Sequence, residues 1–179
     1  PSGGAWTLIK SQTITSSTAD MEFINGTDDV VFDSTYKAYV LLFTDYLPSA
    51  DDSSLVMQIR NTGGSYITSA YCTVGYESYF DTGSMGAQAI NSTTSMIARN
   101  HLGNLATETV SGQLWMYNPS NTASYPYLYY NITFGGGGSS YARNIVGVGA
   151  KRVAYAWDAF KILPNTGTIE NLQATLYGI

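Results

Sequence analysis

The feature that most constrains the fold of this chain is a succession of short segments in which apolar and polar residues alternate, separated by Gly, Ser, Thr, Asn and Asp. Alternation with a period of two is typical of β-strands that bury one face. About nine such segments follow one another, and no period of about 20 to 50 residues repeats. The pattern predicts one all-β domain over residues 1–179, a jelly-roll-like antiparallel β-sandwich.

Two regions depart from simple alternation. Residues 36–47 are apolar on both faces, with Tyr39, Leu41 and Phe43 on one side, which predicts a central strand covered on each side. Residues 75–104 show the weakest pattern, and we expect loops there with at most one short helical turn. The core predicted from the alternation comprises Trp6, Leu41, Phe43, Leu55, Met57, Ile59, Leu114, Leu128, Ile132, Trp157 and Leu176.

The charge balance argues against several partners. The chain has a net charge of −5, with 8 Lys and Arg against 13 Asp and Glu, so it lacks the cations that nucleic acids or anionic membranes attract. Charged residues make up only 12% of the chain, whereas about a quarter is usual. A surface of hydroxyls, amides and the 15 Tyr side chains costs little to desolvate, which favours contacts with proteins or sugars.

Residues that commonly carry chemistry are sparse. Cys72 and His101 are the single Cys and His, so an intrachain disulfide is impossible and a zinc site of the usual kind is nearly excluded. Cys72 lies in a predicted strand, where a buried inert thiol is commoner than a Cys72–His101 pair. The four Gly of residues 135–138 lack the Lys and Ser/Thr of a phosphate-binding loop, and with Ser139 and Ser140 they predict a flexible loop.

Carboxylates offer two weaker alternatives. Asp28, Asp29 and Asp33 could supply calcium ligands, although the spacing of an EF-hand is absent and acidic turns are commonly only solvated. Glu residues are scattered without the signature of a glycosidase pair. We therefore expect no catalytic residue, no cofactor and no metal site, and a protein that is not an enzyme.

Tyrosines give the remaining candidates for an interaction surface. In residues 125–130, alternation sends Tyr125, Tyr127 and Tyr129 to one face and Leu128 and Tyr130 to the other. Such rings pack a sheet face through cross-strand aromatic pairs, or they form a platform for a sugar or a protein. Exposed rings predicted to contact a partner are Tyr76, Tyr79 and Tyr125.

Four segments resemble, in this order, small β-sandwich structural proteins of tailed bacteriophages, particularly those of aquatic and cyanobacterial hosts. These segments are residues 4–9 (GAWTLI), 55–66, 112–119 (GQLWMYNP) and 174–179 (ATLYGI). The resemblance implies a virion protein with no catalytic or binding residue to transfer. It implies either a head decoration (cement) protein or the terminal domain of a tail fibre.

The resemblance and the surface composition together lead to specific expectations. The first is a decoration protein, made in the host cytoplasm, that stabilises the capsid surface by bridging major capsid protein subunits and also associates with copies of itself as a dimer or trimer. The alternative is a fibre tip or carbohydrate-binding domain that contacts a host surface glycan.

Pro1 followed by small residues is what removal of an initiator Met leaves, which favours a complete gene product, although a domain cut from a longer protein would look the same. Neither a signal peptide nor an apolar run of about 18 residues is visible.

Overall fold

A computed structural model describes residues 5–80, 82–135 and 142–179. Its described part is 60% strand and contains no helix. Accordingly, no described segment forms a helix long and apolar enough to cross a membrane.

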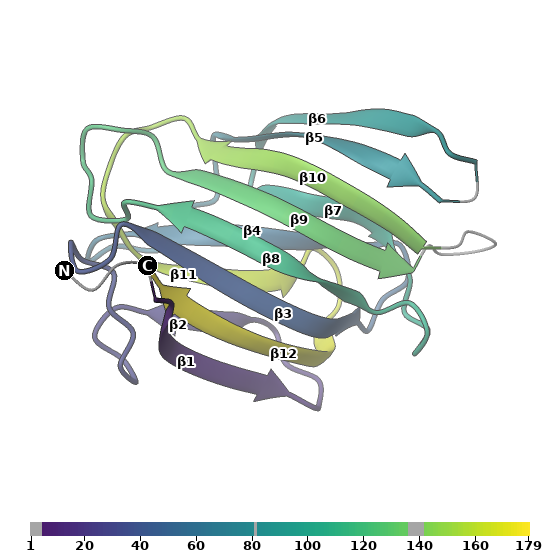
Figure 1. The fold of residues 1–179 in the computed structure, drawn as a ribbon, viewed down its shortest axis with the longest axis horizontal. Helices are drawn as coiled ribbons and strands as arrows, with labels where there is room; N and C mark the ends of the chain where they lie inside the picture. The colour runs from purple at the N-terminus through teal and green to yellow at the C-terminus, as the bar shows by residue number, and fades with distance from the viewer. Residues whose placement is uncertain (1–4, 81, 136–141) are drawn as a thin grey trace.

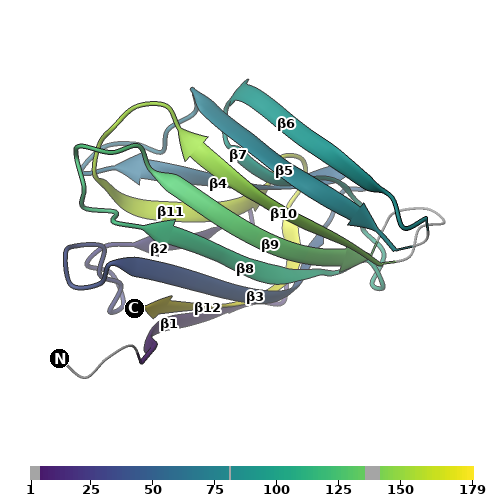
Figure 2. The same ribbon diagram turned by 45° about the horizontal axis from the view of Figure 1, so that its top comes forward.

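Two antiparallel sheets pack face to face around one core (Figure 1), which confirms the predicted all-β sandwich. The larger sheet has eight strands, in the spatial order β1 (Thr7–Ile14), β12 (Ile169–Gly178), β3 (Ala38–Pro48), β8 (Val110–Tyr117), β9 (Tyr127–Gly135), β10 (Ala142–Lys151), β5 (Tyr71–Tyr79) and β6 (Met85–Thr93). The smaller sheet has four, in the order β2 (Met21–Ile24), β11 (Trp157–Pro164), β4 (Ser53–Asn61) and β7 (Met96–Leu102). Figure 2 shows that β1 and β6 form opposite borders of the larger sheet.

The core follows from the alternation. Every second residue of each long strand faces the other sheet, and ten of the eleven predicted core residues are buried in one cluster. The prediction for Trp6 is wrong, because its side chain is 44% exposed. Trp6 precedes the edge strand β1 and lies over the outer side of the sheet, where it contacts Trp115 and Tyr177. Alternation identifies two faces of a strand but does not say which one is inside.

The prediction of loops for residues 75–104 is wrong for most of that region, which forms the end of β5 and the strands β6 and β7. The pattern was weak because the core side of β5 carries Thr73, Gly75 and Glu77 rather than large apolar residues. Gly75 pairs with Gly147 of β10, and both lie against the hydroxyl of the buried Tyr130. A Cβ at either glycine would clash with that hydroxyl, so small residues are required here to fit the ring.

Strands β3 and β9 were predicted more accurately. In β3, Tyr39, Leu41 and Phe43 enter the core, and Val40 on the other side is also buried, although Leu42 and Thr44 are exposed. In β9, Leu128 and Tyr130 are buried while Tyr127 faces outward, as expected from the alternation. Residues 136–140 of the predicted Gly/Ser loop lie outside the described residues.

Candidate functional site

The outer face of the larger sheet carries a continuous row of apolar and aromatic side chains. Because partners in an antiparallel ladder point to the same side of the sheet, the strand register defines which side chains are neighbours. Following the register from β1 to β6 gives one residue per strand: Leu8, Tyr177, Val40, Trp115, Tyr129, Val148, Val74 and Ala89. With strands about 4.8 Å apart, the row extends over about 34 Å.

A second row lies beside the first and mixes polar and apolar residues. It consists of Ser11, Thr175, Leu42, Gln113, Asn131, Val146, Tyr76 and Ala87. Its polar groups are largely bonded to neighbours on the same face, since the Asn144 amide donates to Asn131 Oδ1 at 2.7 Å and the hydroxyls of Ser11 and Thr175 lie 3.0 Å apart. Neither row contains a charged residue, so a partner could cover both without stripping water from an ion.

The half of this face over β12, β3 and β8 is partly covered by its own aromatic rings. Trp6 lies edge-on to Trp115, with ring centroids 5.8 Å apart, and its ring centroid lies 5.6 Å from that of Tyr177. Val40 occupies the register position between Trp115 and Tyr177 and is fully buried, although it does not belong to the core between the sheets. We call Trp6, Trp115 and Tyr177 the ring cluster. It covers Val40 within the chain itself, whereas Leu42 in the second row is 36% exposed.

The other half, over β10, β5 and β6, remains open. Val148 pairs with Val74 and then Ala89, and Val146 pairs with Tyr76 and then Ala87, so that six uncharged residues form a compact block. We call this block the open patch. The exposed fractions are 55% for Val74, 61% for Tyr76, 36% for Val146 and 39% for Val148. Because these exposed apolar side chains are adjacent, the open patch is the candidate interaction surface of the described structure.

Of the three tyrosines proposed from the sequence, one lies in the open patch. Tyr76 belongs to it and is 61% exposed, whereas Tyr79 faces the inner side of the sheet, where its hydroxyl donates to Glu77 Oε2 at 3.3 Å. Tyr125 is exposed in the loop between β8 and β9. The structure therefore does not bring the three rings together on one strand face.

The valines of the patch were missed by sequence reasoning, although β10 carries a signal for them. In this strand the inward Gly147 and Gly149 alternate with the outward Val146 and Val148. The strands of a sandwich usually place large apolar residues on the inner side and polar residues on the outer side, and β10 reverses this pattern with glycines inside and valines outside. Such a reversal is the signal in the sequence that could have identified an apolar outer face.

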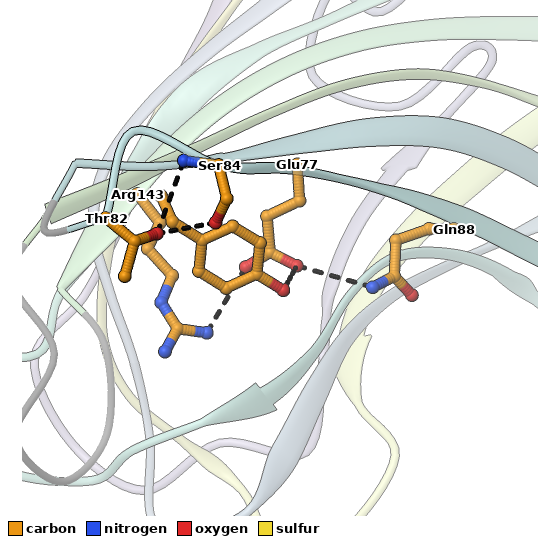
Figure 3. A network of polar contacts seen from close by, with 6 residues as sticks. Glu77, Thr82, Ser84, Gln88 and Arg143 are labelled. Atoms are coloured by element: carbon orange, nitrogen blue, oxygen red, sulfur yellow. Dashed lines mark hydrogen bonds and ion pairs between the residues drawn. The ribbon is translucent and has the colours of Figure 1, made fainter.

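Behind the open patch, on the inner side of the sheet, a polar network joins three strands (Figure 3). Glu77 of β5 is completely buried and accepts from Arg143 Nη1 of β10 and Gln88 Nε2 of β6, each at 3.3 Å. The Arg143 guanidinium also lies over the Tyr79 ring, 4.7 Å from its centroid. These bonds fix β6 and β10 on either side of β5, so the network holds the backbone under the patch in position.

The remaining candidates from the sequence lie apart from one another. His101 is exposed and contacts Asp52 through Nδ1, while the Cys72 thiol lies 3.8 Å from the Ala150 carbonyl oxygen within the larger sheet. Asp28 is bonded to Lys10 at 2.9 Å. The Asp33 carboxylate accepts from the amide of Thr35 at 2.6 Å, and its bonds with Thr35 lower the pKa of the Asp33 carboxyl. Among the described residues, no three His, Cys, Asp or Glu side chains gather to hold a metal ion.

Comparison with known proteins adds no assignment. No family model matches the chain, and no curated protein matches it.

Proposed function

We propose that this chain is a non-enzymatic structural protein that docks on a neighbouring protein through the open patch. The observation that carries the proposal is the uncharged, exposed block of Val74, Tyr76, Val146 and Val148 on a regular strand surface. A protein surface that covered the block would bury apolar area at about 25 cal/mol per Å² without desolvating an ion.

The setting that we propose is the virion of a tailed bacteriophage, with the protein on the capsid surface, bridging subunits of the major capsid protein. The sequence resemblance to small β-sandwich virion proteins supports this setting, and so does the scarcity of charge. A decoration protein stabilises the shell because it binds only the assembled lattice, so that bound copies shift the equilibrium toward the intact particle.

A second candidate is a tail-fibre or carbohydrate-binding domain that contacts a host surface glycan. The observation in its favour is the set of exposed rings, since Tyr76, Tyr117, Tyr125 and Tyr127 each expose between 43% and 61% of their surface. Exposed aromatic rings can stack on sugar rings as well as on protein side chains.

The two candidates separate in an experiment on phage particles that lack the gene and are supplied with protein in trans. Wild-type protein should bind the heads in many copies and delay the loss of DNA on heating. Val74→Lys should fail to bind, because it places a charge in the centre of the open patch. The matched control is Leu105→Lys, which changes an equally apolar and 62% exposed residue in the loop between β7 and β8, and it should behave as wild type.

Particles that lack the protein should still adsorb to host cells. Particles that keep their DNA on heating but fail to adsorb would overturn the decoration role and support the glycan-binding alternative. Equal binding of Val74→Lys and wild-type protein to heads would overturn the assignment of the open patch.

A further inference from the structure

The four sheet edges of the described structure differ in how they are protected against pairing with another strand. Strand β2 has only four residues, β7 pairs with β4 through two register shifts, and β1 contains a bulge between Leu8 and Lys10. Short length, irregular register and a charged residue are the ordinary means by which proteins block an edge. These three edges are therefore poor templates for a further strand.

Strand β6 lacks these protections. It has nine residues, Met85–Thr93, with neither a charged residue nor a proline. Its register with β5 is regular from Met85 to Asn91, and the only shift lies at its last residues. It is the last strand of the larger sheet, and within the described chain β5 is its only neighbour. A long, regular and uncharged edge favours pairing with another strand.

The direction of the free backbone groups of β6 follows from the hairpin. The amide of Tyr79 donates to the Ser84 carbonyl oxygen at 3.0 Å, so Tyr79 and Ser84 form a hydrogen-bonded pair. Such pairs alternate with non-hydrogen-bonded pairs along an antiparallel ladder. Gly86 and Gln88 therefore bond to β5, whereas Met85, Ala87 and Ala89 direct their N–H and C=O groups toward the open edge.

We propose that β6 pairs antiparallel with β6 of a second copy of this chain, forming a two-fold homodimer with one continuous sheet of 16 strands, eight from each copy. A two-fold axis brings residues near the centre of the interface close to their own counterparts, so a charged strand would repel itself. Met85, Ala87 and Ala89 are uncharged, and the two alanines leave room for a close approach. A different partner would gain from complementary charges, which β6 does not offer.

The dimer would also extend the candidate site. Ala87 and Ala89 belong to the open patch and lie at its β6 border, next to Tyr76 and Val74. Pairing of the two β6 strands would place two open patches side by side on one sheet, with the two alanine borders at the centre. The inference does not depend on the proposed docking role, since it concerns the isolated protein in solution.

The experiment is sedimentation equilibrium of the full chain over a range of concentrations, with Ala87→Pro as the test variant. Proline removes the N–H that points to the open edge and is tolerated on edge strands where that group is free, so pairing with β5 should persist. The molar mass of the wild-type protein should approach twice the 19.3 kDa of one chain as the concentration rises. Ala87→Pro should raise the dissociation constant of the dimer about tenfold or more, because the two-fold axis makes the lost hydrogen bond occur twice. The matched control, Ala87→Ser, keeps the N–H and should dimerise as wild type.

Amide hydrogen exchange locates the contact. In wild-type protein the amides of Ala87 and Ala89 should gain protection as the concentration rises, while those of Gly86 and Gln88 should stay protected at every concentration and in Ala87→Pro. Loss of protection at Gly86 and Gln88 would mean that proline has unfolded the strand. In that case Ala89→Lys is the test variant instead of Ala87→Pro. Its added charge should weaken the dimer at low salt, and dimerisation should recover in high salt. A wild-type chain that stays monomeric up to millimolar concentration, or a dimer that Ala87→Pro and Ala89→Lys leave intact, would overturn the proposal.

Discussion

The outer faces of the two sheets are built from opposite kinds of residues. On the smaller sheet, Glu22, Lys161 and Gln58 form a cross-strand row, and Lys161 Nζ donates to Asp20 at 2.8 Å. On the larger sheet the corresponding rows contain valine, tyrosine and neutral polar side chains, without a charge. Both faces lie on the outside of the same sandwich, so burial in the core does not account for the difference.

The charged face satisfies its own groups. Arg60 Nε donates to Asp158 Oδ1 at 2.8 Å, the amide of Gly63 donates to Asp158 Oδ2 at 3.0 Å, and Lys161 lies over the Tyr66 ring, 4.6 Å from its centroid. Burial alone would raise the pKa of the Asp158 carboxyl, but the bonds from Arg60 and Gly63 outweigh it and lower that pKa. A face that satisfies its charges internally stabilises the fold and offers little to a partner, whereas the open patch has the reverse properties.

The largest effect is expected from Trp115→Ala, which removes from the ring cluster the indole that lies beside Trp6. The substitution uncovers Val40 and ends the edge-on contact with Trp6, so the free energy of unfolding should fall by about 3 kcal/mol, near the lower limit for loss of a tryptophan. Chemical denaturation followed by circular dichroism measures it. A loss below about 1 kcal/mol would show that the ring cluster is as open as the patch beside it.

A smaller effect is expected on the charged face from Asp158→Asn, which keeps the size of the side chain and removes its charge. Two hydrogen bonds to a charged group weaken, so the free energy of unfolding at neutral pH should fall by about 2 kcal/mol. The matched control is Asp28→Asn, which breaks the ion pair with Lys10 at a 71% exposed carboxylate and should change stability very little.

The pH dependence of the free energy of unfolding provides an independent check of the stabilising role of the Asp158 carboxylate. A carboxyl whose pKa is lower in the folded chain stabilises the fold above its unfolded pKa of about 4, and this contribution is lost as the pH falls through the folded pKa. The stability difference between wild type and Asp158→Asn should therefore be largest at neutral pH and shrink in acid. A difference that stays constant down to about pH 2 would contradict the assignment.

The sequence predicted the fold class and most of the core because alternation on strands such as β4 and β9, and the long apolar run of β3, are local signals. It did not predict the site, because the open patch exists only through the register of β10, β5 and β6. Val74 and Val148 are far apart in the chain and become neighbours only when those strands pair. The strands were themselves hard to recognise, since Gly75 and Gly147 stand where large core residues would normally mark a strand, and they do so to fit the distant Tyr130.

The smallest expected effect compares two valines on the outer faces. Val148→Thr exchanges a methyl for a hydroxyl of the same shape in the open patch, where 39% of the residue is exposed, so the hydroxyl stays hydrated and stability should change by less than about 0.5 kcal/mol. Val56 lies on the outer side of the smaller sheet but is only 3% exposed, and Val56→Thr should cost about 1 to 2 kcal/mol because its hydroxyl would be buried. Thermal unfolding of both variants side by side measures the difference. If Val148→Thr costs as much as Val56→Thr in protein dilute enough to be monomeric, the patch is already covered within one chain and is not free to bind a partner.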